Sequence, residues 1–221
     1  MRRVLVLRPQ SGAGATVKRA RDLGLEAVAV PLFEIEPVAW EAPEASGFDG
    51  LLLTSANAVR QGGAQIEKLR GLPVYAVGDA TAEAARNAGF DVAASGDDGV
   101  DRLLGSIEAG LKLFHPCGED RREPTEPRQR ITPITVYRAK PIQEPDLSAA
   151  QGAVALVHSP RAGARFAELL SDRASVAIAA ISAAAAEAVG GGWQSVETAE
   201  APNDDALLAL AARLCDNSPP E

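Results

Sequence analysis

The chain has 221 residues, and its 22 lysines and arginines against 30 aspartates and glutamates give a net charge of −8. A chain of this length forms one large domain or two small ones, and either choice buries a substantial core. Its 46% hydrophobic and 24% charged residues are typical of a soluble globular protein, which excludes disorder as the main state. The acidic balance argues against a nucleic-acid partner, which needs a basic surface, but it permits an anionic small molecule in a locally positive cleft.

Cysteine usage and hydropathy indicate where the protein works. Cys117 and Cys215 are too few for a disulfide scaffold or a cysteine-rich metal site, which favours a reducing compartment. The longest apolar run, 176–186, is shorter than the roughly 20 residues that span a bilayer. The first apolar run ends at Arg8 after four residues, as in a strand rather than a secretion signal. We therefore expect a cytoplasmic protein with no membrane partner.

Short apolar, β-branched runs alternate with alanine-rich stretches along the chain. This alternation predicts an α/β fold, in which parallel sheets are covered by helices on both faces. The predicted strands are 4–7, 27–31, 51–54, 74–77, 92–94, 111–114, 131–137, 153–158, 176–181 and 195–198.

Glycines mark the ends of the clearest predicted helices, because glycine readily takes the left-handed conformation of a C-cap. The last predicted helix, 204–215, begins after Asn203, a residue type that caps helix N-termini. The segment 119–130 contains Pro124 and Pro127, so we expect a short helix or a loop there. The helices closed by glycine are 13–23, 80–88 and 97–109, followed by Gly24, Gly89 and Gly110 respectively.

The chain repeats itself at an offset of 104 residues. Residues 54–58 lie over 158–162, and residues 77–83 lie over 181–187, without a gap between the two matches. This register predicts a duplicated α/β unit and hence two similar lobes of about five strands each. A cleft between two lobes is a common place for a ligand.

Polar residues gather where predicted strands end, which is the ligand-binding edge of parallel α/β sheets. Helix N-termini at this edge favour anions. Simpler interpretations stay open: Ser55 and Ser159 as N-caps, Tyr137 as a packing residue, and the two histidines as hydrogen-bonded strand ends. The candidates are Arg8, Ser55, Asn57, Gly78, Thr81, His115, Gly118, Tyr137, His158, Ser159, Arg161 and Ser182.

Several other chemistries lack their motifs. The sequence contains no Walker A loop and no G-x-S-x-G elbow. Gly12 and Gly14 follow a strand, but Val17 stands where a dinucleotide fingerprint needs its third glycine. No carboxylate stands at metal-ligand spacing from either histidine. The charged pairs 97–98 and 121–122 are interpreted as solvated helix ends.

Seven short motifs follow one another along nearly the whole chain. In their order and spacing they resemble those of the uroporphyrinogen-III synthase family. They are 8–9 (RP), 31–37 (PLFEIEP), 54–60 (TSANAVR), 77–84 (VGDATAEA), 118–121 (GEDR), 136–138 (VYR) and 158–162 (HSPRA).

The resemblance implies a particular domain organisation, with two α/β lobes joined by two adjacent extended strands. One lobe comprises 1–35 and 140–221, and the other comprises 36–139. This differs from a tandem interpretation of the repeat, in which the lobes would be 1–104 and 105–221. The strands that cross between lobes would lie near 33–37 and 136–141, and a proline in each suits a strand with few ladder bonds.

The resemblance also implies an activity. The family takes the linear tetrapyrrole hydroxymethylbilane, expels its hydroxyl as water, inverts the terminal ring and closes the macrocycle to uroporphyrinogen III, on the route to haem. This makes the expected protein a cofactor-independent, metal-free hydro-lyase and a monomer. Because the substrate closes without inversion when left alone, the task is largely one of proximity and orientation.

Individual residues take their expected roles from the same resemblance. Tyr137 matches the tyrosine near the leaving hydroxyl and is the candidate to assist its departure by hydrogen bonding or proton donation. Arg8 and Arg161 would supply positive charge. Two departures from the family pattern are Ala185, where a hydroxyl residue is common, and His158, where threonine is usual. The residues expected to receive substrate carboxylates are Ser55, Asn57, Gly78, Thr81, Gly118, Ser159 and Ser182.

Two alternatives of other classes remain at this point. A non-catalytic two-lobed module that binds an anionic metabolite would use the same repeat and the same hydroxyls, although it would not need Tyr137. A nucleotide-dependent α/β enzyme would use Gly12 and Gly14.

Overall fold

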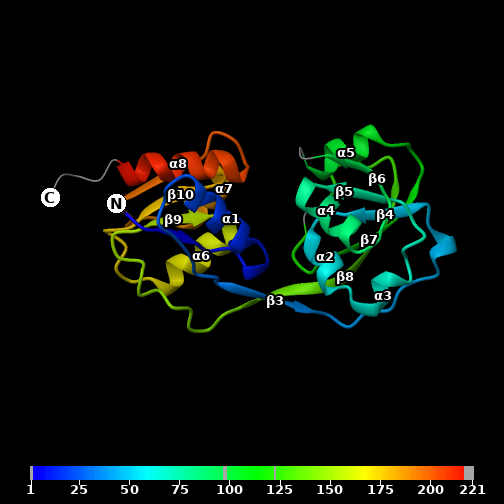
Figure 1. Ribbon diagram of the computed structural model, residues 1–221, viewed down its shortest axis with the longest axis horizontal. Coiled ribbons are helices and arrows are strands. Elements are labelled where there is room, and N and C mark those ends of the chain that lie inside the picture. Colours follow the sequence, from blue (N-terminus) through cyan, green and yellow to red (C-terminus); the bar gives the residue numbers. More distant parts are fainter. Residues whose placement is uncertain (1, 97–98, 122, 217–221) are drawn as a thin grey trace. The chain divides into compact units, whose positions relative to one another are not determined.

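The computed structural model describes residues 2–96, 99–121 and 123–216 (Figure 1). The chain divides into two compact units, Met1–Glu34 with Pro141–Glu221 (unit 1) and Ile35–Lys140 (unit 2). The chain thus passes between the units twice, within a strand each time. Among the described residues, no helix is both long and apolar enough to cross a membrane.

Unit 1 contains a five-stranded parallel sheet with the strand order β11-β10-β9-β1-β2. Parallel strands need helical crossovers, and the alanine-rich stretches between the strands supply them. The strands are β1 (Val4–Val6), β2 (Ala27–Ala29), β9 (Val154–Val157), β10 (Ala177–Ala180) and β11 (Ser195–Thr198). The helices are α1 (Gln10–Asp22), α6 (Pro160–Leu169), α7 (Ala183–Ala188) and α8 (Asp204–Asp216).

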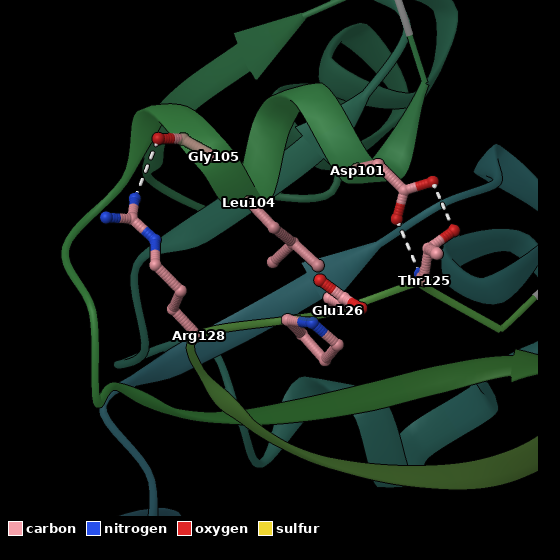
Figure 2. A pocket seen from close by; sticks show the side chains of 7 residues that line it. Asp101, Leu104, Gly105, Thr125, Glu126 and Arg128 are labelled. Atoms are coloured by element: carbon pink, nitrogen blue, oxygen red, sulfur yellow. Dashed lines mark hydrogen bonds between the residues drawn. The ribbon is translucent and has the colours of Figure 1, made fainter.

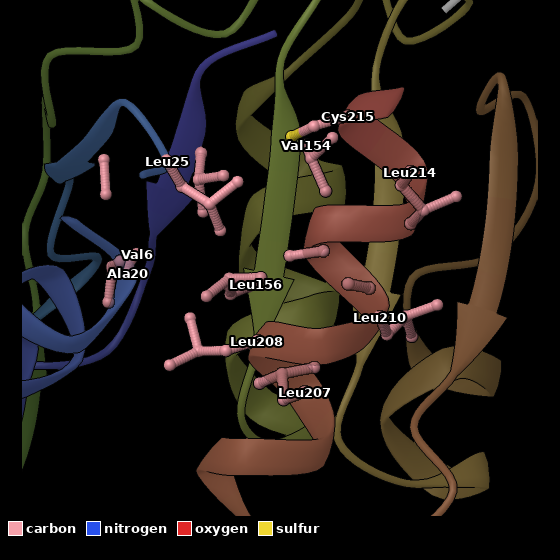
Figure 3. Packing of buried hydrophobic residues seen from close by; sticks show 14 of the residues in the cluster. Val6, Ala20, Leu25, Val154, Leu156, Leu207, Leu208, Leu210, Leu214 and Cys215 are labelled. Atoms are coloured by element: carbon pink, nitrogen blue, oxygen red, sulfur yellow. The ribbon is translucent and has the colours of Figure 1, made fainter. Parts of the chain in front are cut away.

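The two faces of this sheet are both buried, as expected for parallel strands. Alternate residues of β1 and β9, such as Val6 and Leu156, pack with α1 and α8 in one core (Figure 3). From α8, the leucines 207, 208, 210 and 214 enter this core. On the other face, Gly163 of α6 lies so close to Val157 that a Cβ there would be 3.2 Å from the valine Cγ1.

Unit 2 contains a six-stranded sheet with the order β3-β8-β7-β4-β5-β6, in which the pairs β8-β7, β7-β4, β4-β5 and β5-β6 are parallel. The strands are β3 (Phe33–Pro37), β4 (Gly50–Leu53), β5 (Val74–Val77), β6 (Val92–Gly96), β7 (Lys112–Gly118) and β8 (Arg130–Pro141). The helices are α2 (Ala56–Gln61), α3 (Gly63–Glu67), α4 (Asp79–Asn87), α5 (Val100–Ser106) and the short 3₁₀ helix Ala45–Gly47.

The core of unit 2 also lies on both faces of its sheet. Leu51 and Phe114 belong to the cluster with α2, α3 and α4, whereas Leu52 and Leu113 belong to the cluster with α5. Trp40 stacks on Phe114 with the ring centroids 6.1 Å apart. The helices therefore leave the carboxyl ends of the strands as the accessible edge.

The repeat in the sequence is also a repeat of structure. A shift of 104 residues carries β4 onto β9 and carries the first residues of α2, α4 and α5 onto those of α6, α7 and α8. The strand orders correspond too: β6-β5-β4-β7-β8 in unit 2 matches β11-β10-β9-β1-β2 in unit 1, strand for strand. The prediction of two similar α/β lobes with parallel sheets is confirmed.

Most predicted elements are present, and the differences have local causes. Gly24 and Gly89 follow their helices with φ of +80° and +84°, as predicted. The helix predicted over 97–109 ends at Ser106 instead, since Ile107 is extended. The Gln129 side-chain amide donates hydrogen bonds to the carbonyl groups of Leu104 and Glu108, which stabilises this end of the helix. Gly110 therefore lies in a turn and does not end the helix. The other end of the prediction, Asp97 and Asp98, lies outside the described residues.

The proline-containing segment after Gly118 is a loop throughout its described part, 119–121 and 123–129. The prediction that proline prevents a full helix there is confirmed. Asn203 caps α8 as predicted, because its Oδ1 accepts from the Ala206 N–H at 2.9 Å.

Candidate functional site

The carboxyl edge of the unit 2 sheet holds a cavity of about 380 Å³. It forms there because β4, β5 and β7 all end at the same edge with a polar residue or glycine, while Tyr137 lies beside this edge within β8. Its volume lies within the range of ligand sites in proteins. Its lining residues are Thr54, Ser55, Val77, Gly99, Val100, Asp101, Gly118, Asp120, Arg121 and Tyr137.

Tyr137 owes its orientation to Gly118 on the neighbouring strand. The pairing of β7 with β8 shifts between Cys117 and Gly118, so that Gly118 pairs with Tyr137. Such a bulge redirects a side chain. A Cβ at Gly118 would lie 2.8 Å from both Cε2 and Cζ of the tyrosine and 3.0 Å from its Oη. Only glycine at this position lets the ring lie here.

The Tyr137 phenol keeps its proton at neutral pH. Burial raises the pKa of Tyr137, and a hydrogen bond with the Ser55 side chain partly offsets this effect. The Ser55 Oγ also accepts from the Asn57 N–H at 3.2 Å, as the N-cap of α2. The phenol is thus an uncharged donor in a cavity large enough for part of an organic ligand.

Arg121 supplies a cationic side chain to the same cavity. Its Nη2 lies 2.8 Å from Glu123 Oε1, and its side chain is 27% exposed. The interpretation of Arg121 as a solvated helix end is wrong, because the loop turns it into the cavity wall. A sequence signal existed, since Arg121 belongs to the GEDR motif; Arg122 lies outside the described residues.

The buried histidine behind this wall is uncharged. His115 is 2% exposed, and its Nε2 lies 3.1 Å from Thr54 Oγ1. Burial, reinforced by the positive charge of Arg121, lowers the pKa of His115 to about 4. Of the simpler interpretation, the hydrogen bond is present, but His115 lies in the middle of β7 and not at a strand end, because the strand continues to Gly118.

Three further predicted residues lie near this edge without lining the cavity. Gly78 precedes α4 with φ of 85°, which only glycine adopts easily. Thr81 is 5% exposed within α4. Asn57 lies in α2, and its Oδ1 is buried with no hydrogen-bond partner in the described structure.

The carboxyl edge of the unit 1 sheet carries the remaining candidates. Ser159 and Ser182 are N-caps, accepting from the Ala162 and Ala185 N–H groups at 3.2 and 3.3 Å. The Arg161 guanidinium lies 4.6 Å from the centre of the Phe33 ring. Phe33 is the repeat counterpart of Tyr137, but it is buried and has no hydroxyl group.

Asp204 organises this second edge, and sequence reasoning did not single it out. Its Oδ1 lies 2.9 Å from His158 Nε2 and 3.7 Å from Arg8 Nη1, and its Oδ2 lies 3.0 Å from Thr16 Oγ1. Burial by itself would raise the pKa of Asp204. The hydrogen bonds with His158 and Thr16 lower this pKa by more than burial raises it, so the pKa lies below its ordinary value. The only hint in the sequence is its place directly after the N-cap Asn203.

Gly12 leaves room for the Arg8 side chain and does not form a phosphate-binding loop. It lies inside α1, and a Cβ there would be 2.7 Å from Arg8 Nε. A phosphate-binding glycine loop lies before a helix, not within it. The structure thus gives the nucleotide-dependent alternative no support.

A second cavity, of about 360 Å³, lies between α5 and residues 125–128 (Figure 2). Asp101 accepts from Thr125 N at 2.7 Å, and Arg128 Nη2 donates to the Gly105 carbonyl at 2.8 Å. These bonds fasten the loop to both ends of α5, so we assign this cavity a structural role. Among the residues described, no group of three or more His, Cys, Asp or Glu side chains is placed to hold a metal ion.

Comparison with known proteins identifies the family. The family model described as uroporphyrinogen-III synthase HemD matches residues 14–209. A uroporphyrinogen-III synthase of Chlorobaculum parvum (strain DSM 263 / NCIMB 8327) is 41% identical over 61 residues, which are 27% of this chain and 25% of that protein.

Solved structures show the same fold. Uroporphyrinogen-III synthetase from Helicobacter pylori 26695 superposes with a TM-score of 0.66 and 16% identity, covering 97% of this chain and 100% of that one. A mutant uroporphyrinogen III synthase from the extremely thermophilic bacterium Thermus thermophilus gives a TM-score of 0.50 and 18% identity over 99% and 100%. The chain belongs to the uroporphyrinogen-III synthase family.

Proposed function

We propose that the chain converts hydroxymethylbilane to uroporphyrinogen III, with Tyr137 assisting departure of the hydroxyl group. The family match supports the reaction. The observation that carries the role of Tyr137 is its uncharged phenol in a cavity of about 380 Å³, held against Gly118.

The reaction balances with the phenol as a proton carrier. The C–O bond of the hydroxymethyl group breaks, and its electron pair leaves with the oxygen while electrons of the pyrrole ring stabilise the carbon. Tyr137 donates a proton to the departing oxygen, so that water leaves. Formation of the new C–C bond releases one proton from the attacked pyrrole, and this proton restores the phenol. The only net loss is one water, and this balance requires no other reactant.

The substrate carboxylates are proposed to be bound by the residues that the resemblance implies. Hydroxyl groups and backbone N–H groups accept carboxylates without a basic surface, and arginines add charge-assisted bonds. Ser55 is proposed for the same role, and its Oγ also accepts the Asn57 N–H, as the N-cap serines 159 and 182 accept theirs. The proposed residues are Arg8, Asn57, Gly78, Thr81, Gly118, Ser159, Arg161 and Ser182, together with Arg121.

The finer features of this proposal follow the resemblance. We propose a hydro-lyase that needs no cofactor or metal and acts as a cytoplasmic monomer. Its partner is the tetrapyrrole, with no role for a membrane or a nucleic acid. The net charge of −8 agrees with the lack of a nucleic-acid partner in this proposal, because such a partner needs a basic surface.

The direct test is to follow the isomers that the protein makes. Freshly prepared hydroxymethylbilane is incubated with the full chain, the products are oxidised to porphyrins, and isomers III and I are separated by chromatography. We expect isomer III in large excess, whereas a protein-free sample yields isomer I. Tight binding of the substrate with isomer I alone would instead favour the non-catalytic binding module.

Arg121→Gln is expected to raise KM about 10-fold with a smaller change in kcat, because it removes a charge-assisted bond to a carboxylate. Steady-state kinetics measure this effect. The matched control is Arg70→Gln, since Arg70 is half exposed and pairs with Glu67 on the surface of the same unit. An equal change of KM in both variants would remove Arg121 from substrate binding.

A further inference from the structure

We infer that Asp204 is a positioning residue: through the Thr16 hydroxyl it holds the Arg8 guanidinium at the carboxyl edge of the unit 1 sheet, where Arg8 binds a substrate carboxylate. This inference rests on the proposed function, which takes Arg8 as a carboxylate ligand. It adds the residues that fix the position of that arginine, and all of them lie in unit 1.

The hydrogen bonds between these three side chains run in one direction only. Thr16 Oγ1 lies 3.0 Å from Asp204 Oδ2 and 3.3 Å from Arg8 Nη1. Against the effect of burial, the bonds with His158 and Thr16 keep the pKa of Asp204 below its ordinary value, so this group is a carboxylate that only accepts. A guanidinium only donates. Arg8 therefore donates to the threonine oxygen, and the single hydroxyl hydrogen of Thr16 goes to Asp204.

Other residues hold Asp204 in place independently of Arg8. Its Oδ1 accepts from His158 Nε2 at 2.9 Å, and its Oδ2 accepts from Arg19 Nη1 at 3.1 Å. The Asp204 side chain is 15% exposed and Thr16 is fully buried, so the bond between them is shielded from water. The carboxylate therefore stays compensated when Arg8 directs its charge to a ligand.

Within the described residues, Arg8 keeps donors for such a ligand. A guanidinium carries five N–H groups, and the contacts with Thr16 and Asp204 use Nη1 alone. Nη1 lies 3.7 Å from Asp204 Oδ1, which is too long for a hydrogen bond, so the two charges are only loosely paired. The Arg8 side chain is 37% exposed, which leaves it within reach of a substrate carboxylate.

Gly12 fixes the place of this guanidinium from the other side. A Cβ at Gly12 would lie 2.7 Å from Arg8 Nε and 2.9 Å from Arg8 Cζ, so the flat group lies directly against the first turn of α1. A Cβ at Gly14 of the same helix would meet no such neighbour within 4 Å among the described residues. The close approach is thus particular to Gly12, and an alanine there must displace the guanidinium.

The internal repeat shows that this network belongs to unit 1. A shift of 104 residues places Val100 of unit 2 opposite Asp204, and a valine side chain accepts no hydrogen bond. The same shift pairs Thr54 with His158, the residue that departs from the family's usual threonine and bonds Asp204. Unit 1 thus combines a histidine and an aspartate where unit 2 has a threonine and a valine.

Steady-state kinetics of isomer III formation test the network. Thr16→Val keeps the shape of the side chain but lacks the hydroxyl. We expect it to raise KM about 5-fold with kcat changed less than about twofold, and Thr16→Ser to restore KM. Asp204→Asn should raise KM to a similar extent. Its matched control, Asp205→Asn, should keep the wild-type KM, because the Asp205 side chain is 86% exposed and pairs with Arg19.

Two comparisons show whether the effect passes through Arg8. Arg8→Gln should itself raise KM about 10-fold, and Thr16→Val should add nothing in that background. Gly12→Ala should raise KM in the direction of Arg8→Gln, whereas Gly14→Ala, the same change in the same helix, should keep the wild-type KM. A wild-type KM in Thr16→Val, or effects that multiply in the double variant, would overturn the inference.

Unfolding in urea separates this inference from the proposed function. In a Trp40→Phe background, the fluorescence of Trp193, which stacks on Phe166, reports unit 1 alone. We expect the urea midpoint of Arg8→Gln/Thr16→Val to fall by less than the sum of the two single falls, because both changes remove the same hydrogen bond. Additive falls would overturn the bond between Arg8 and Thr16. A wild-type chain that made no isomer III would overturn the proposed function, and with it the ligand of Arg8, whereas the midpoints would still report the bond.

Discussion

Tyr137→Phe is expected to lower kcat for formation of uroporphyrinogen III by about 100-fold or more, within the 10²–10⁴ range of general acid catalysis. The phenylalanine ring still fits against Gly118, so the fold and KM should change little. Because the substrate closes by itself without inversion, the variant should also release a larger share of isomer I. Quenched time courses with separation of the isomers measure both effects.

The chain contains its own control for this substitution. Tyr75, the only other tyrosine, packs its ring in the core beside α5 and does not line the cavity. Tyr75→Phe should therefore retain the wild-type kcat. Tyr137→Phe with the same kcat as Tyr75→Phe would remove the phenol from the chemistry while leaving the family assignment intact.

Gly118→Ala tests the placement of the phenol without removing it. The added Cβ would lie 2.8 Å from the ring, closer than real Cβ contacts, so the ring must move. We expect a loss of kcat in the direction of Tyr137→Phe and little further loss when the two substitutions are combined. Full activity in Gly118→Ala would mean that the position of the ring is not critical.

The sequence predicts the α/β class, the parallel sheets and most of the elements because these depend on local pattern. Ser55 lies where predicted because β4 ends where its apolar run stops. The predicted ends at 114 and 137 are wrong, since β7 and β8 continue to Gly118 and Pro141. Gly24 was identified correctly because a C-cap needs its left-handed conformation.

What the sequence could not predict depends on contacts between distant segments. Asp204 meets His158 across 46 residues and Thr16 across 188, and no local pattern shows either bond. The sequence predicts Arg121 at a solvated helix end, but the residue lies in a loop that directs its side chain into the cavity wall. The early end of α5 likewise depends on Gln129, which lies 25 residues beyond Leu104.

The second large effect expected is acid destabilisation of unit 2 through His115. Its pKa is lowered from an ordinary value of 6.5 to about 4, because the folded chain buries the neutral ring. Below pH 6.5, His115 binds a proton in the unfolded chain, whereas in the folded chain it binds this proton only near pH 4. The stability present above pH 6.5 is therefore lost as the pH falls, by about 3 kcal/mol over this window.

The two tryptophans allow this loss to be measured in one unit at a time. Trp40 stacks on Phe114, the neighbour of His115, whereas Trp193 stacks on Phe166 in unit 1. In a Trp193→Phe background, fluorescence during urea unfolding reports unit 2 alone. The free energy of unfolding should fall steadily from pH 6.5 toward pH 4, before most carboxylates protonate.

His115→Gln separates this titration from every other acid effect. Glutamine can still bond the Thr54 hydroxyl but takes up no proton, so the pH dependence of unit 2 should flatten between pH 6.5 and 4. An identical slope with and without the histidine would contradict the assignment. Because the charge of Arg121 also lowers the pKa of His115, Arg121→Gln should raise that pKa and narrow the window. Stability against pH thereby reports, without any substrate, that the positive charge of Arg121 lies near His115.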